Sequence, residues 1–384
     1  MRENPPTKAE LERLVTNADD PIDSLADDLL NLEPFVKEIT RLILTSQRGR
    51  STVFGLFGPW GSGKTSIKKL LLNELKLVKK PRVIAVDFNP WAFSSQDAVL
   101  GAFFREIANA LETRRLTRGI GRGIATLGTY LESGAEVVEY VAAKPLAVAL
   151  KGSAKIIKSV AKHTADPEAT DQESLERIQK RLRDKLADFG QSILVIVDDI
   201  DRLSPLQIVT VFQIIRQNLN LPNLNFLLLM DRPTVEGHLK KQGFGADYLD
   251  KIVQCDLNVP RVTSEERRAL LSAGVQLLFG GRWTNDCTNR LNRAWGIGLD
   301  DLLGTLRRVK RTLQSLAFYR RLFEGDRALE VDPVDLLVIE VLRKHAPSAH
   351  DLIPTVVQET LRRCEDQVLV RWTPSLRPRG AIFK

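Results

Sequence analysis

Short apolar runs alternate with amphipathic helical stretches over the first two-thirds of the chain. The apolar runs occupy residues 53–57, 82–88, 193–197, 226–230 and 252–259. Between these runs, apolar residues recur at steps of three and four, as in 66–77 and 98–113. This is the spacing of one helix face. Short strands that alternate with helices are typical of a parallel sheet with both faces covered. The pattern therefore predicts an α/β fold with helices on both faces of a parallel sheet.

The two ends of the chain have helical patterns without strands. In the N-terminal segment, residues 1–50, Leu25, Leu29 and Ile39 lie at helical spacing, and we expect this segment to pack on the sheet. Beyond the last apolar run, helices are predicted at 264–279, 286–295, 300–323, 333–345 and 351–365. We therefore expect an α/β domain over 1–262, with a helical insertion at 114–165, and an α-helical domain over 263–384.

A glycine-rich stretch directly follows the first apolar run. It comprises Gly58, Pro59, Trp60, Gly61, Ser62, Gly63, Lys64 and Thr65, and it fits GxxxxGK[ST] at every fixed position between a predicted strand and a predicted helix. Such glycines let the backbone curl until its N–H groups surround phosphate oxygens, and the helix directs its positive end at the same anion. The pattern predicts a nucleotide site in which Lys64 contacts the β- and γ-phosphates. Thr65, followed by Ser66, would place its hydroxyl on Mg²⁺.

Two carboxylates follow the apolar run 193–197. Because ligands in open α/β sheets bind outside the carboxyl ends of the strands, we predict that Asp198 belongs to the Mg²⁺ shell. Asp199 is predicted to act as the base or as the polarising group on the attacking water. The run 226–230 ends in Asp231 and Arg232, for which a γ-phosphate sensor and an ordinary strand-end turn both stay open.

Composition narrows the functional classes. The 384 residues are 43% hydrophobic and 27% charged, with a formal net charge of +8, which favours anionic partners such as nucleic acid or acidic lipid without selecting one. The three cysteines lie far apart, which excludes a disulfide framework and a cysteine zinc site. Neither a secretory signal nor a spanning apolar run is present, and we expect a cytoplasmic protein. Of the five tryptophans only Trp60 is expected near the nucleotide, and the others are expected in the core.

Seven stretches in order resemble the KAP family of P-loop NTPases, in the additional-strand division that includes AAA+ and STAND ATPases. They are GPWGSGKT at 58–65, FNPWAF at 88–93, VDDIDRLSP at 197–205, LMDRPTVE at 229–236, YLDKIVQ at 248–254, RRVKRTL at 307–313 and PVDLLVIEVLRKHAP at 333–347. The resemblance implies that ATP and Mg²⁺ are held by the glycine-rich loop, with Asp198 and Asp199 serving metal binding and hydrolysis. It also implies a C-terminal lid whose Arg307 turns towards the nucleotide. Charge alone leaves a solvated face or a nucleic-acid patch open for the basic stretch at 307–311.

The sequence departs from the family between the loop helix and the acidic strand. Many KAP proteins carry transmembrane helices there, whereas residues 114–165 contain no spanning stretch. At about 100° per residue, one helical face gathers lysines. These are Lys144, Lys151, Lys155, Lys158 and Lys162. Two interpretations stay open: a basic amphipathic helix on an anionic membrane surface, and a surface helix packed on the protein with solvated lysines.

The resemblance predicts a nucleotide-controlled molecular switch. ATP is chosen over GTP by resemblance alone, and adenine is expected near residues 17–35. The nucleotide state would reposition the lid, and with it an unknown protein partner or effector; a homo-oligomer and a peripheral position at the inner face of the membrane are further expectations. The bacterial relatives imply antiphage defence. An AAA-like nucleic-acid-binding initiator or loader and a non-hydrolysing nucleotide-binding scaffold are the alternatives.

Overall fold

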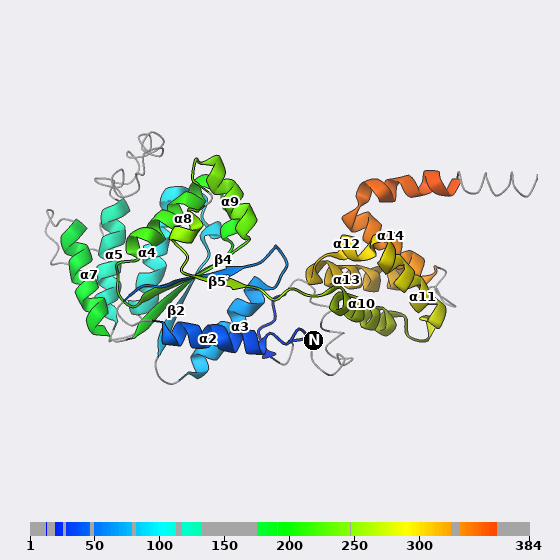
Figure 1. The fold of residues 1–384 in the computed structure, drawn as a ribbon, viewed down its shortest axis with the longest axis horizontal. Coiled ribbons are helices and arrows are strands. Elements are labelled where there is room, and N and C mark those ends of the chain that lie inside the picture. The colour runs from blue at the N-terminus through cyan, green and yellow to red at the C-terminus, as the bar shows by residue number, and fades with distance from the viewer. Residues whose placement is uncertain are drawn as a thin grey trace, which may run out of the picture. The chain divides into compact units, whose positions relative to one another are not determined.

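The computed structural model of the chain has two compact units, one containing Pro21–Arg261 and the other containing Val262–Lys384. Figure 1 shows the elements of each unit. The structure describes residues 13, 20–25, 28–46, 50–78, 82–112, 117–132, 175–189, 191–245, 247–323 and 331–358.

The first unit is built on a parallel sheet, as predicted. Its strands are β1 (Val53–Phe57), β2 (Val83–Phe88), β3 (Ser192–Val197), β4 (Leu224–Met230) and β5 (Cys255–Asn258). Their order is β2-β3-β4-β1-β5, and every neighbouring pair is parallel. Although β2 comes between β1 and β3 in sequence, the strand between them in space is β4. The carboxyl ends of β1, β4 and β3 therefore lie side by side at one edge of the sheet.

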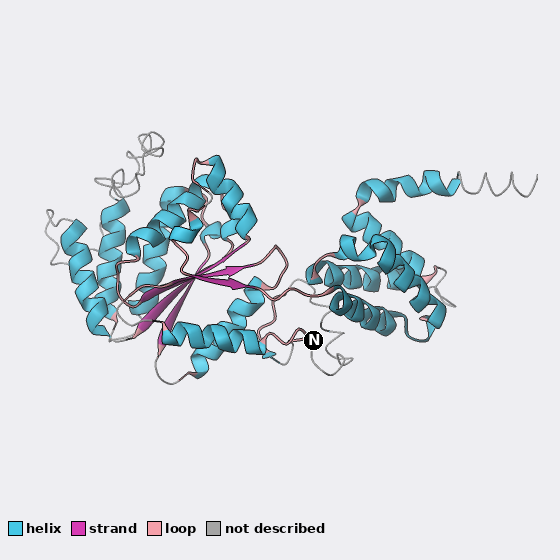
Figure 2. Ribbon diagram, viewed as in Figure 1, coloured by secondary structure: helices cyan, strands magenta, loops and turns pink. Residues whose placement is uncertain are grey.

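Helices cover both faces of this sheet (Figure 2). One face packs on α2 (Glu33–Thr45) and α3 (Lys64–Leu77), where Leu194 and Ile196 of β3 join the core. Val195 and its neighbours in the alternating register face the other core, because successive side chains of a strand point to opposite faces. The helices on that side are α4 (Gln96–Glu112), α5 (Arg118–Glu132), α7 (Leu175–Phe189), α8 (Pro205–Asn218) and α9 (Arg232–Lys241).

Among the described residues 20–46, the α-helix of the N-terminal segment is confined to α2, a shorter stretch than predicted. Leu29 and Leu30 lie in a turn before α2, and Leu25 lies in a 3-10 turn. The physical reason is a turn at Asp28, whose carboxylate accepts hydrogen bonds from the backbone N–H groups of Leu30 (3.2 Å) and Glu33 (3.0 Å). Aspartate that bonds nearby backbone in this way competes with helix and marks a helix start.

The predicted strand at 252–259 is also shorter, because only Cys255–Asn258 pairs with β1. A 3-10 turn at Leu249–Lys251 precedes it. Ile252, Val253 and Val259 flank the strand as buried core residues, so their apolar character reflects burial rather than strand pairing.

The second unit is helical, as predicted for the C-terminal part. It contains α10 (Ser264–Phe279), α11 (Asn285–Ala294), a π-helical stretch at Trp295–Leu299, α12 (Asp300–Leu303), α13 (Leu306–Phe323) and α14 (Pro333–His345), followed by helical residues 347–358. The helix predicted at 300–323 is interrupted at Gly304, whose φ is 31°. A side chain rarely adopts that conformation. Gly274 of α10 lets Leu313 of α13 approach closely, since an added Cβ would lie 2.4 Å from it.

The described part of the insertion at 114–165 is the helix α5. Its Ile120, Ile124 and Leu127 are buried in the core with Leu182 of α7. The lysine face at 144–162 lies outside the described residues. None of the helices that the structure describes is long and apolar enough to cross a membrane.

Gly128 lets α5 pack closely on α4, and this contact gives a stability prediction. An added Cβ would lie 2.6 Å from the Cβ of Phe104, so Gly128→Ala is expected to cost about 1–3 kcal/mol through overpacking. Gly119→Ala on the same helix is the matched control, because nothing lies within 4 Å of its added Cβ. In thermal unfolding we expect a lower midpoint for Gly128→Ala alone. Equal midpoints for the two variants would show that α4 and α5 do not pack this closely.

Candidate functional site

The glycine-rich loop lies between β1 and α3, with Lys64 as the first residue of the helix. Gly61 (φ 82°) and Gly63 (φ 97°) adopt left-handed backbone conformations, which glycine tolerates and most residues do not. The backbone N–H of Gly58 donates to Met230 at the end of β4 (3.2 Å). The loop is thus anchored to the strand that separates β1 from β3.

Lys64 is buried and lies within the curl of the loop. Its Nζ donates to the carbonyl oxygens of Gly58 (2.7 Å) and Pro59 (3.4 Å) and lies 3.7 Å from an Asp201 carboxylate oxygen. An amine held among carbonyl oxygens can exchange them for phosphate oxygens, which are stronger acceptors for a cation.

Features of the loop itself suit a nucleotide phosphate. The buried hydroxyl of Ser62 has no hydrogen-bond partner among the described residues, and a buried polar group without a partner is costly. An added Cβ on Gly58 would lie 2.5 Å from that hydroxyl oxygen, so a larger residue there would displace the Ser62 side chain. Thr65 lies half-buried in the first turn of α3. The hydroxyl of Ser66 accepts a hydrogen bond from the backbone N–H of Ile22 (3.3 Å) and so anchors the N-terminal segment beside the loop helix.

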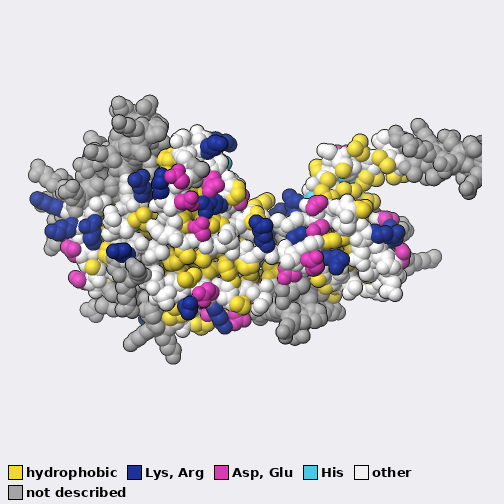
Figure 3. All heavy atoms as spheres, viewed as in Figure 1, with side chains coloured by type: hydrophobic (Ala, Val, Ile, Leu, Met, Phe, Trp, Pro, Cys, Tyr) yellow, Lys and Arg dark blue, Asp and Glu magenta, His cyan; other side chains and the backbone are white. Residues whose placement is uncertain are grey.

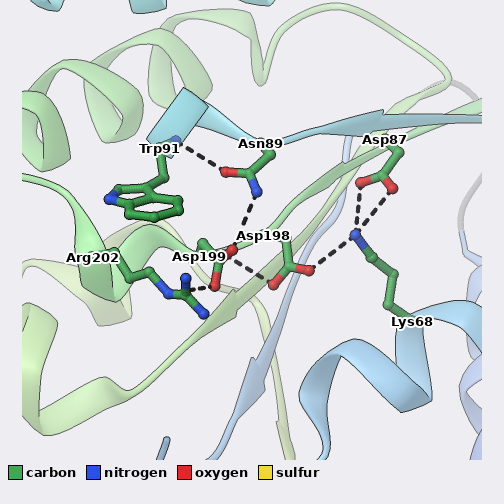
Figure 4. A network of polar contacts seen from close by, with 7 residues as sticks. All are labelled: Lys68, Asp87, Asn89, Trp91, Asp198, Asp199 and Arg202. Carbon is green, nitrogen blue, oxygen red and sulfur yellow. Dashed lines mark hydrogen bonds and ion pairs between the residues drawn. The ribbon is translucent and has the colours of Figure 1, made fainter. Parts of the chain in front are cut away.

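Asp198 lies at the end of β3 with both carboxylate oxygens engaged. One oxygen accepts from the backbone N–H of Asp199 (2.9 Å), and the other lies 2.9 Å from Nζ of Lys68. Lys68 also reaches both carboxylate oxygens of Asp87 on β2, at 3.1 and 3.0 Å. Burial lowers the pKa of Lys68, but the charges and hydrogen bonds of Asp198 and Asp87 outweigh it, and the pKa is raised overall. Lys68 therefore stays charged between the two strands (Figure 4).

Asp199 is held by side chains from two further elements (Figure 4). Its carboxylate pairs with Nε of Arg202 (2.9 Å) and accepts from Nδ2 of Asn89 (3.2 Å), the residue that follows β2. Its backbone is left-handed, with φ at 58°. Burial and the neighbouring charge of Asp198 raise the pKa of Asp199, against the opposing effects of Arg202 and Asn89. A raised pKa makes a carboxylate a better proton acceptor.

Trp91 does not belong to the core, contrary to expectation. It is 55% exposed on the 3-10 turn Pro90–Ala92, and the guanidinium of Arg202 lies 5.0 Å from its ring centroid. A cation over an indole face is attracted by the ring quadrupole. This attraction explains why the ring stays beside Arg202, which pairs with Asp199. Trp283 and Trp295 are buried as expected, whereas Trp372 lies outside the described residues.

The end of β4 carries an ion-pair cluster around Arg232. The guanidinium pairs with Glu236 (2.7 Å), Asp256 (2.7 Å) and Asp250, and it lies 5.2 Å from the ring centroid of Phe57. These bonds raise the pKa of Arg232, chiefly through the hydrogen bond to Glu236. Such engagement supports the strand-end turn for this arginine. Asp231 accepts from the hydroxyl of Thr234 (2.5 Å), at the same sheet edge as Asp198.

Arg307 lies in the second unit, as the second residue of α13. Lys310 and Arg311 follow on the same helix, and the backbone oxygen of Arg311 accepts a hydrogen bond from Lys344 (2.8 Å). The approach of Arg307 to nucleotide stays a prediction.

Three side chains around Asp198 and Asp199 were missed in the sequence although each carries a signal. Lys68 follows Lys64 by four residues, which places both on one face of the loop helix. Asp87 interrupts an apolar run, and Asn89 directly follows that run. Both signals identify polar residues at a strand end, where ligands of α/β sheets bind.

The described residues contain no group of three or more His, Cys, Asp and Glu side chains able to hold a metal ion. A magnesium ion in a P-loop site takes its ligands from a Ser or Thr hydroxyl, one carboxylate, water and the nucleotide itself. Thr65 in the first turn of α3 and Asp198 directly after β3 supply one hydroxyl and one carboxylate, which suits a metal that arrives with nucleotide.

Comparison with known proteins assigns most of the chain. The model of the KAP family P-loop domain matches residues 32–323. The Phage T7 exclusion protein of Escherichia coli (strain K12) is 27% identical over 349 residues, which cover 86% of this chain and 46% of that protein. The chain thus spans about half the length of this relative.

Solved structures with similar folds include two proteins of Aeropyrum pernix. The ORC1 protein in complex with DNA is 15% identical, with a TM-score of 0.44 over 86% of this chain and 69% of that chain. The ORC2 protein in ADPNP–ADP complexes is 14% identical, with a TM-score of 0.43 over 86% of this chain and 71% of that chain.

Proposed function

Because the chain belongs to the KAP family of P-loop NTPases, we propose that it hydrolyses ATP with Mg²⁺ and works as a nucleotide-controlled switch. The observation that carries the proposal is the placement of the loop at the end of β1, with the two carboxylates of β3 at the same sheet edge. A phosphate site alone supports binding. A phosphate site beside two differently held carboxylates supports hydrolysis as well, because one can serve the metal and the other the water.

Each residue has a distinct role in the proposed reaction. The backbone N–H groups of the loop and Lys64 hold the phosphates, and Thr65 and Asp198 hold the metal, which supplies charge neutralisation at the phosphate oxygens. Asp199 takes the proton of the attacking water. Asn89 and Arg202, which contact its carboxylate, fix the orientation of this base.

The N-terminal segment is the proposed neighbour of the adenine. Ile22 bonds to Ser66, and the backbone oxygen of Asp23 accepts from the side chain of Asn73 (2.7 Å). The segment therefore runs along α3, beside the loop that would hold the phosphates. Preference for ATP over GTP rests on family membership.

The direct test is phosphate release by the purified chain with ATP, in Mg²⁺ and in EDTA, with and without anionic vesicles. We expect steady hydrolysis in Mg²⁺ and none in EDTA, since the metal neutralises the charge that develops on the phosphates. Stimulation by vesicles would support the membrane-surface role of the lysine face at 144–162, and hydrolysis indifferent to lipid would support the packed surface helix. Nucleotide binding without any hydrolysis would overturn the proposal in favour of the non-hydrolysing scaffold.

A role in antiphage defence is proposed from the Phage T7 exclusion protein of Escherichia coli. The similarity to that protein covers 86% of this chain. Exclusion would require the switch to act on a partner or effector. A nucleic-acid partner is the alternative, favoured by the net charge of +8. Binding of duplex DNA that weakens steeply with salt and ignores ATP would support this alternative, whereas no retention of DNA would exclude it.

A further inference from the structure

Lys68 is a buried cation that joins three elements of the nucleotide site. It lies one turn after Lys64 on α3, and its Nζ contacts Asp198 after β3 and Asp87 on β2. Lys68 is 8% exposed and Asp198 3% exposed. Figure 4 shows the lysine pointing from the loop helix between the two carboxylates.

The two acidic partners of Lys68 differ in burial. The side chain of Asp87 is 46% exposed, so water can solvate it without the lysine. Asp198 is almost wholly enclosed, and its other oxygen is occupied by the backbone N–H of Asp199. A buried carboxylate that loses its cation becomes an uncompensated charge. Lys68 therefore orients the Asp198 carboxylate together with that backbone N–H.

We propose that Lys68 is a positioning residue, which holds Asp198 in the orientation that receives the Mg²⁺ of the bound nucleotide. The proposal rests on the proposed function. Side chains that orient a metal ligand without touching the metal typically change metal affinity by about 10–100-fold when removed. Because Lys68 and Lys64 share one helix, the same element places the phosphate contact and the metal carboxylate.

Competition between Lys68 and the metal for Asp198 would change the Mg²⁺ dependence in the opposite direction. A cation 2.9 Å from Asp198 also cancels part of the negative charge that attracts Mg²⁺. If Lys68 chiefly competed with the metal, removing it would lower the Mg²⁺ concentration that the site needs. The direction of the Mg²⁺ dependence separates positioning from competition.

The test uses the whole chain with Lys68→Met, Lys68→Arg and Asp87→Asn. Lys76→Met is the matched control, because Lys76 lies on the exposed last turn of the same helix, with Asn73 as its contact. Affinity for a fluorescent ATP analogue is measured in EDTA and across a Mg²⁺ titration, and hydrolysis is followed across the same titration.

For Lys68→Met we expect an unchanged affinity in EDTA, within about twofold, and a Mg²⁺ midpoint raised about 10-fold or more. Lys68→Arg is expected to restore most of the midpoint, and Asp87→Asn to raise it less than Lys68→Met because the Lys68–Asp198 pair remains. If Lys68→Met fails to fold, Lys68→Arg and Asp87→Asn carry the test in the binding measurement.

A Mg²⁺ midpoint that stays constant or falls in Lys68→Met would overturn the proposal, as would a loss of affinity equal in EDTA and Mg²⁺. Wild-type protein that binds nucleotide more tightly with Mg²⁺ but does not hydrolyse it would overturn the proposed hydrolysis only, because the midpoint is read from binding. Wild-type protein that binds no nucleotide would overturn both.

Discussion

Replacing Lys64 by alanine is expected to abolish hydrolysis and to weaken nucleotide binding strongly. The Lys64 amine lies in the curl of the loop, bonded to the carbonyl oxygens of Gly58 and Pro59. Its loss removes the one side-chain cation that the loop itself offers to the β- and γ-phosphates. Since removing a single preorganised group that stabilises developing charge costs about 10²–10³ in rate, we expect phosphate release to fall at least about 100-fold. The measurement is phosphate release at saturating ATP together with affinity for a fluorescent ATP analogue.

Lys76→Ala is the control for the Lys64 variant, because it removes the same charge from the last turn of the same helix. Lys64 also lies 3.7 Å from the enclosed carboxylate of Asp201, so the fold of Lys64→Ala must be compared by thermal unfolding. A folded Lys64→Ala protein that hydrolyses ATP within tenfold of the wild type would show that the loop is not the phosphate site.

The fold was predictable because a local sequence pattern marks each of the strands and the loop helix. The apolar runs at 53–57 and 193–197 lie within β1 and β3, and the loop glycines punctuate the first of them. The order of the strands within the sheet was not predictable from such patterns. That β4, rather than β2, lies between β1 and β3 follows from backbone pairing between segments about 170 residues apart, which no local pattern records.

The residues of the site were predictable where they directly follow a strand. Asp198 and Asp199 follow a strand in the sequence, and the structure places them at the sheet edge beside the loop. Lys68 and Asn89 carry local signals, but their contacts with these carboxylates were not predictable, because they span more than 100 residues. The exposure of Trp91 was missed for a related reason: its ring lies against Arg202, a contact that depends on how the ends of β2 and β3 approach each other.

The second unit marks the limit of what local patterns reveal. Two helices, Ser264–Phe279 and Pro333–His345, have the predicted bounds, since each begins at a capping residue, Thr263 or Asp332, whose side chain bonds the first turn. The break at Gly304 was missed because an isolated glycine inside a helical pattern is tolerated and does not by itself end a helix.

Asp199→Asn is expected to stop hydrolysis while leaving nucleotide binding nearly intact. An amide cannot accept the proton of the attacking water, and general base catalysis contributes about 10²–10⁴ in rate. Asparagine suits the site in shape: it tolerates the left-handed backbone found at φ 58°, and its side chain can still bond to Asn89. The partly exposed pair with Arg202 contributes no more than about 1 kcal/mol, so the fold should persist.

The informative comparison sets hydrolysis against binding in the same Asp199→Asn protein. Asp247→Asn is the matched control, since it removes an exposed carboxylate paired with Lys251 (2.7 Å). A fall in phosphate release of about 100-fold or more, with affinity for the Mg²⁺–nucleotide within about threefold of the wild type, assigns the base to Asp199. Equal and negligible hydrolysis by wild type and variant would instead mean that the two carboxylates serve binding alone. In that case the raised pKa of Asp199 would reflect burial beside Asp198 and no catalytic role.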